Sequence, residues 1–213
     1  MALNERYPIL YYALLTLTHK IGAAGKLFEK LQPVFEGDQL KGALKGCWYS
    51  EIGALNQVMA VLEYPDAGQI ADDRAALLES GNPFGAADLL TDIDFSSYKS
   101  FPGVAPIQTG DFGPFFEVRR YGLTLDGLPP TFAAWDKVRE ERSKLSPLLM
   151  VMYALDGAVP HFVHIWPYRS LEERAKMRAK AVEVGIWPPP GGPPYLRVMR
   201  SDIFLPAPFS PTR

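Results

Sequence analysis

The sequence repeats itself at an offset of 104 residues, and this repeat constrains the fold more than any other feature. Residues 162–174 read as an alternating strand that leads into a helix, whose start is marked by Ser170 with Glu173 three residues later. Residues 58–64 again read as a strand, and a helix again follows, beginning at Asp66. The chain is therefore predicted to contain two copies of one design.

Each copy shows the same predicted order of elements: strand, helix, strand, strand, helix, strand. In the first copy the strands are expected at residues 9–18, 43–51, 58–64 and 89–95, and in the second at 115–121, 148–155, 162–168 and 196–205. This order is that of the ferredoxin-like βαββαβ unit, an antiparallel sheet with two helices on one face. We predict an α+β protein of two such domains, residues 1–105 and 106–213. Because each sheet leaves one face uncovered, the domains should pack sheet to sheet as an α/β barrel.

Composition and charge exclude several classes of protein. Hydrophobic residues make up 47% of the chain, which is enough for a core, and the formal net charge of −2 gives no general attraction to nucleic acid. The apolar run of residues 7–17 is too short to span a bilayer and is expected to be a strand. Cys47 is the sole cysteine, so no internal disulfide forms. The sequence favours a soluble, cytoplasmic protein with no membrane insertion.

Several short motifs, taken in their order and spacing, resemble the NIPSNAP family over nearly the whole chain. In the second copy they are Phe116–Tyr121, Trp135, Arg142, Ser146–Leu148, His164–Tyr168, Arg174, Arg178, Gly185, Trp187–Pro188 and Pro208–Pro211. In the first copy they are Trp48–Glu51, Gly53, Asn56, Glu63–Tyr64 and Arg74.

The resemblance implies tandem ferredoxin-like domains in the dimeric α/β-barrel group, which also holds cofactor-free monooxygenases and haem-handling enzymes. Animal members of the family are mitochondrial proteins tied to vesicle traffic and mitophagy. This chain departs from them because it lacks a transit-like N-terminus.

Strand alternation places the candidate site residues on shared faces. If Phe116 and Val118 point to the helices, then Glu117, Arg119 and Tyr121 point into the barrel. By the same rule, Val163 and Ile165 face the helices while Phe162, His164 and Trp166 face the interior. The two strands should be neighbours, because the first and third strands of a βαββαβ unit form its central pair. The candidate catalytic residues are Glu117, Tyr121 and His164, and the candidate ligand-binding residues are Arg119, Phe162, Trp166 and Tyr168.

Each candidate also has a purely structural interpretation. Glu117 and Arg119 could belong to a salt-bridge network, and His164 could be a hydrogen-bonded core histidine. No metal site is expected, because His161 and His164 lie on opposite strand faces. No cofactor is expected either; haem is the less favoured alternative and would need His164 as its axial ligand. The proline-rich segment 187–194 reads as a rigid arm over a domain or subunit edge.

Two hypotheses about function follow. The first is a protein that binds a small molecule in the barrel between the repeats, with cofactor-independent catalysis as an extension. The second is a non-catalytic assembly or interaction module with a structurally filled barrel. A homodimer or higher homo-oligomer is compatible with both.

Overall fold

The first copy forms the predicted six-element unit. The computed structural model describes residues 7–213. The first copy comprises β1 (Tyr11–His19), α1 (Ala24–Glu36), β2 (Ala43–Ile52), β3 (Gln57–Tyr64), α2 (Ala67–Glu79), a short 3-10 turn η1 (Pro83–Gly85) and β4 (Leu90–Ser100).

The second copy repeats this order. It comprises β5 (Phe115–Leu123), α3 (Leu128–Leu145), β6 (Met150–Ala154), β7 (His161–Tyr168), α4 (Leu171–Glu183), a short 3-10 turn η2 (Pro193–Tyr195) and β8 (Leu196–Pro206). The pairs β1 and β5, β3 and β7, and α2 and α4 each begin and end 104 residues apart, which confirms the repeat. None of the helices within residues 7–213 is both long and apolar enough to cross a membrane.

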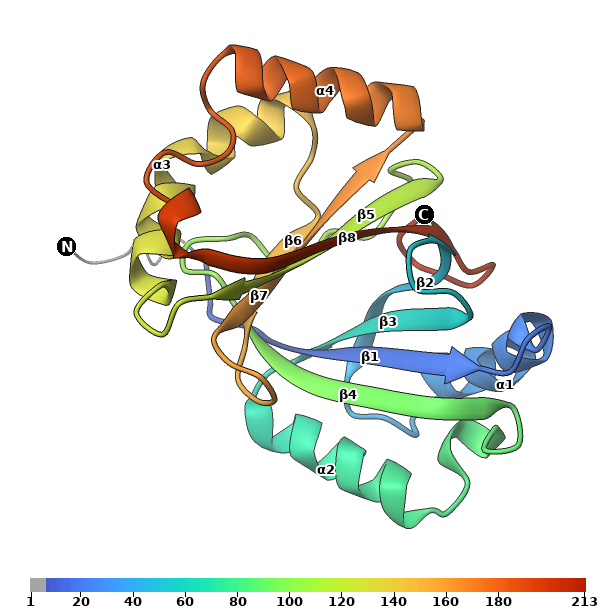
Figure 1. Cartoon of the computed structure of the whole chain (residues 1–213). Coiled ribbons are helices and arrows are strands. Elements are labelled where there is room, and N and C mark those ends of the chain that lie inside the picture. Colours follow the sequence, from blue (N-terminus) through green and yellow to red (C-terminus); the bar gives the residue numbers. More distant parts are fainter. Residues whose placement is uncertain (1–6) are drawn as a thin grey trace.

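All eight strands join in one closed antiparallel barrel, in the order β1-β3-β2-β8-β5-β7-β6-β4. Within each copy the first and third strands are neighbours, as predicted, and every residue of β7 pairs with β5. The copies are joined twice, by β2 against β8 and by β4 against β6. Figure 1 shows the helices outside the strands, with α3 and α4 on one side and α1 and α2 on the other. The predicted barrel of tandem ferredoxin-like repeats is confirmed, whereas the division into domains at residues 105 and 106 stays a prediction.

Packed apolar side chains fill the barrel interior. One buried cluster draws on all eight strands and on no helix, and it includes Trp48, Met59, Phe116, Met152 and Phe204, each fully buried. Two further clusters lie outside the barrel: one joins the first sheet to α1 and α2, the other joins the second sheet to α3 and α4. The prediction of a ligand pocket inside the barrel is therefore wrong, because packed side chains already occupy that volume.

The two strand faces are the reverse of the sequence-based assignment. Phe116 and Val118 lie in the barrel interior, as do Val163 and Ile165. Glu117 and its same-face neighbours instead lie beneath α3 and α4, as shown by the contacts described below. Alternation fixes which residues share a face but not which face points inward. No helix residue within residues 7–213 belongs to the interior cluster, whereas on the outer face Glu117 can pair with residues from the helices. The one charged residue of β5 on the inner face, Arg120, pairs with Asp202 of β8 instead.

Candidate functional site

A polar and aromatic layer lies between β5 and β7 and the helices that cover them. Glu117 lies opposite Trp166 across the β5–β7 ladder, Arg119 lies opposite His164, and Tyr121 opposite Phe162. The predicted juxtaposition of these two residue sets is therefore present, although outside the barrel.

Glu117 is the centre of a buried ionic network. Its carboxylate is fully buried, and Oε1 accepts from Arg174 Nη2 of α4 at 2.6 Å and from Arg119 Nη1 at 3.2 Å. Arg178 Nη1, also on α4, lies 3.5 Å from the same oxygen, and the Ser201 hydroxyl donates to it at 2.7 Å. Oε2 has no partner among the described residues. One carboxylate therefore neutralises three guanidinium groups only in part.

His164 is a neutral, fully buried imidazole with a defined tautomer. Trp166 Nε1–H donates to His164 Nδ1 at 2.6 Å, so Nδ1 is unprotonated and Nε2 carries the hydrogen. Burial holds the pKa of His164 well below its usual range, and the charges of Arg119 and Arg142 lower it further. The Nε2–H group has no hydrogen-bond partner within residues 7–213. His164 is thus a donor without an acceptor.

The buried neutral state of His164 predicts a pH-dependent stability. The unfolded chain takes up a proton near pH 6.5 while the folded chain does not, so below that pH the unfolded state binds more protons. The free energy of unfolding should then decrease as the pH falls, by up to about 1.4 kcal/mol per pH unit. Chemical denaturation between about pH 7.5 and 5.5 measures this slope. His164→Gln should remove the contribution of His164 to this slope; an unchanged slope in His164→Gln would contradict the assignment.

Aromatic rings surround His164 on several sides. The ring centroids of Tyr121 and Trp135 each lie 5.0 Å from that of His164 in edge-on geometry, and Phe162 stacks on it at 5.5 Å. Trp187, from the proline-rich arm, contacts Trp135 at 5.0 Å. The arm therefore folds back onto its own domain.

A pocket of about 300 Å³ opens beside this layer. Its polar lining side chains are Arg119, Tyr121, Thr131 and Arg178. Its remaining lining residues are Trp135, Phe162, Val182, Trp187, Pro188, Pro189, Gly192, Pro193, Leu196 and Met199. Apolar walls with a few converging polar groups are typical of small-ligand sites. Burial raises the pKa of Tyr121, while the neighbouring Arg119 opposes that rise, and Arg119 Nε donates to the Tyr121 hydroxyl.

The first copy provides an internal reference for this face of the sheet. The positions of Glu117, Arg119, Tyr121, His164, Trp166 and Arg174 are occupied there by Ala13, Leu15, Leu17, Ala60, Leu62 and Ile70. All six of these first-copy residues are buried in an apolar core under α1 and α2. The same backbone arrangement is therefore stabilised without any of the polar residues, and the fold does not explain their presence in the second copy.

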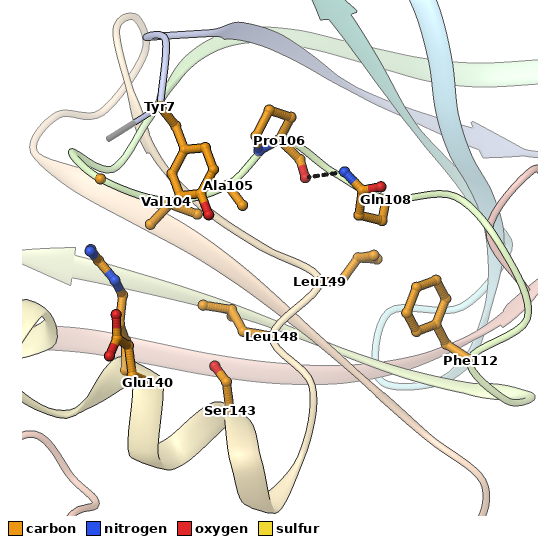
Figure 2. A pocket seen from close by; sticks show the side chains of 12 residues that line it. Tyr7, Val104, Ala105, Pro106, Gln108, Phe112, Glu140, Ser143, Leu148 and Leu149 are labelled. Carbon is orange, nitrogen blue, oxygen red and sulfur yellow. Dashed lines mark hydrogen bonds between the residues drawn. The ribbon is translucent and has the colours of Figure 1, made fainter. Parts of the chain in front are cut away.

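A second hollow of about 280 Å³ lies between α3 and the segment that connects the two copies. Figure 2 shows Tyr7, Val104 and Ala105 on one side of it and Glu140 and Ser143 of α3 on the other. Arg139, which also lines it, donates to the Pro102 carbonyl at 2.9 Å and pairs with Asp136 at 3.0 Å. The seven predicted site residues do not line this hollow, so we place the candidate site beneath α3 and α4.

Haem does not fit this site. His164 was the candidate axial ligand, but its ring is fully buried and is enclosed by Tyr121, Trp135 and Phe162, which leave no face for a macrocycle. Within residues 7–213, no three His, Cys, Asp or Glu side chains come together as metal ligands would.

The seven predicted site residues gather in one layer, but they do not all reach the pocket. Arg119, Tyr121 and Phe162 line it. The other four lie behind its wall: Glu117, His164, Trp166 and Tyr168. Burial raises the pKa of Tyr168, whose hydroxyl accepts from Arg142 at 3.4 Å.

Sequence reasoning missed four residues that build the site. The sequence predicts Trp135 in the core stripe of a helix and Trp187 in a rigid arm over a domain or subunit edge. It predicts Arg174 and Arg178 on a solvated or interface-lining helix face. The repeat carried a signal for two of them, since Trp135 and Arg174 replace the apolar Leu31 and Ile70 of the first copy.

The fold and the site define a single-chain α/β barrel of tandem ferredoxin-like repeats, with a ligand-sized pocket under the helices of the second repeat. The family model of NIPSNAP matches residues 12–83 and 116–211, one segment in each repeat. The chain belongs to the NIPSNAP family.

A curated relative agrees with this assignment. A NipSnap homolog protein of Dictyostelium discoideum is 29% identical over 149 residues, which cover 67% of this chain and 64% of that protein. The chain thus spans less than two thirds of the length of this relative.

Two solved structures share the overall fold. An anthrone oxidase-like protein has a TM-score of 0.65 at 11% identity, covering 97% of this chain and 94% of its own. A putative monooxygenase from Lactobacillus acidophilus has a TM-score of 0.63 at 10% identity, covering 93% and 94%. At these identities the likeness concerns the fold alone.

Proposed function

We propose that this NIPSNAP-family protein binds a small organic molecule in the pocket between the second sheet, α3, α4 and the proline-rich arm. One observation carries the proposal: the second repeat replaces an apolar core by polar and aromatic residues at matching positions, and a pocket of about 300 Å³ opens beside them. A cavity of this size, at the small end of ligand pockets, suits a molecule of one or two rings.

The predicted site residues take two kinds of role in this proposal. Arg119, Tyr121 and Phe162 contact the ligand, because they line the pocket. Glu117 positions Arg119, and Trp166 holds the His164 ring in its tautomer. Of the residues expected to be catalytic, Tyr121 is the one placed to exchange a proton with a bound molecule, so any chemistry at this site depends on its hydroxyl.

Blocking the pocket tests the proposal. Met199 lines the pocket on β8 and is 59% exposed, so Met199→Trp should fill the pocket entrance at little cost in stability. We expect fragments of one or two aromatic rings to bind the unmodified chain and to lose about tenfold or more in affinity for Met199→Trp. Ligand-observed NMR with a fragment set, followed by calorimetry, measures this loss.

Val198→Trp is the matched control. Val198 is adjacent on β8, is 81% exposed and does not line the pocket, so a tryptophan there should leave binding unchanged. Equal binding by Met199→Trp and the unmodified chain would place the ligand elsewhere and overturn the proposal.

The alternative function, an assembly module without a ligand, is favoured by the filled barrel interior. It requires the Glu117 network to be structural, and the first copy argues against this requirement because it folds the same unit with Ala13 and Ile70 in place of Glu117 and Arg174.

A further inference from the structure

The charges around the pocket do not balance. Arg119, Arg174 and Arg178 share the single carboxylate of Glu117, and all three contact the same oxygen. The charged side chains that line the pocket are Arg119 and Arg178. The network therefore retains two positive charges in excess, next to a cavity with apolar walls.

A fourth guanidinium adds to this excess. Arg142 is buried, and its guanidinium carbon lies 4.2 Å from the ring centroid of Trp166 and 5.5 Å from that of Trp187. Within residues 7–213, no carboxylate pairs with it, and its Nε and Nη1 atoms have no hydrogen-bond partner. Aromatic faces stabilise a cation only in part, so the positive potential extends behind the pocket wall.

In the described part of the chain, Arg178 lacks the separate carboxylate partner that the corresponding arginine of the first copy has. Its counterpart Arg74 pairs with Asp156 at 2.9 Å and donates to Ser97. The residue that corresponds to Asp156 at the 104-residue offset is Ile52, which carries no charge. Arg178 instead lies 3.5 Å from the shared Glu117 carboxylate, the longest of the three arginine contacts to that oxygen.

These observations fix the chemistry that the pocket favours. A carboxylate matches the planar donor array of guanidinium groups and forms charge-assisted hydrogen bonds with them. Trp135, Phe162 and Trp187 form aromatic walls that suit a planar ring. We infer that the pocket takes a small aromatic carboxylate, with the carboxylate on Arg119 and Arg178 and the ring against the aromatic walls. The inference rests on the proposed function and specifies its ligand class.

An isosteric pair of ligands tests the charge preference. The probes are 2-naphthoate and its neutral analogue 2-naphthamide, titrated calorimetrically at low ionic strength. The carboxylate should bind about tenfold or more tightly than the amide, and this preference should shrink at high salt. Arg178→Gln should reduce the preference to about threefold or less, because it removes one of the two guanidinium groups that line the pocket.

Arg74→Gln is the matched control, since it makes the same change at the corresponding position of the first copy and should leave the preference intact. Equal affinities for the acid and the amide would overturn the ligand class while the proposed function stands. If neither probe binds, both the ligand class and the proposed function are overturned. A preference that survives in Arg178→Gln would place the carboxylate elsewhere and overturn the inference as well.

Discussion

Glu117→Gln should lower the free energy of unfolding by about 3 kcal/mol, the lower end of the range for a broken buried ion pair. The Glu117 carboxylate is fully buried and is shared by Arg119, Arg174 and Arg178, whose side chains are 13%, 28% and 32% exposed. Glutamine retains an oxygen acceptor but loses the charge, so three guanidinium groups then face one another without a counter-ion. Their partial contact with water keeps the loss at the lower end.

Urea denaturation measures this loss, and Glu141→Gln is the control. Glu141 pairs with Lys144 at 2.5 Å on the surface of α3, with side chains 60% and 68% exposed, so its loss should leave the free energy of unfolding almost unchanged. If repulsion between the three guanidinium groups is the cause, the loss in free energy of unfolding of Glu117→Gln should become smaller in about 1 M salt. A deficit that is small, or equal to that of Glu141→Gln, would show that Glu117 does not hold the arginines together.

Most of the fold could be predicted from the sequence, because the repeat multiplies weak local signals. The strand signal at residues 58–64 is ambiguous by itself, but the same pattern 104 residues later gives each copy the element order of a known unit. Pairing of β5 with β7 then follows from topology rather than from any residue. The closure of the barrel follows from the need to cover the second face of each sheet.

The orientation of the faces could not be predicted in the same way. Alternation groups Glu117 with Arg119 and Phe116 with Val118, yet a strand covered on both sides gives no local signal for which group faces the interior. The deciding information is tertiary: Arg174 and Arg178 come from a helix more than fifty residues away in the chain, and they stabilise Glu117 on the outer face. Helix periodicity places both arginines on one side of α4 but does not name their partner.

Grafting first-copy residues onto the second copy should separate stability from function. The triple variant Glu117→Ala, Arg119→Leu, Arg174→Ile takes its residues from Ala13, Leu15 and Ile70, which form a buried apolar core in the first copy. Replacing a buried ion network by apolar residues is often neutral or stabilising by about 1–4 kcal/mol, whereas removing one member is costly. The variant keeps Arg178, whose side chain is 32% exposed and can be hydrated without the Glu117 carboxylate. We expect the triple variant to recover most of the stability that Glu117→Ala alone loses.

The same variant should lose ligand binding, because Arg119 lines the pocket and Glu117 positions it. Urea denaturation of the single and triple variants gives the stability difference, and titration with 2-naphthoate gives the affinity. Recovered stability with lost binding would show that the second copy keeps these charges for a ligand at the expense of stability. A triple variant as unstable as Glu117→Ala would mean instead that the network supports the fold, and the comparison between the two copies would then no longer point to a binding site.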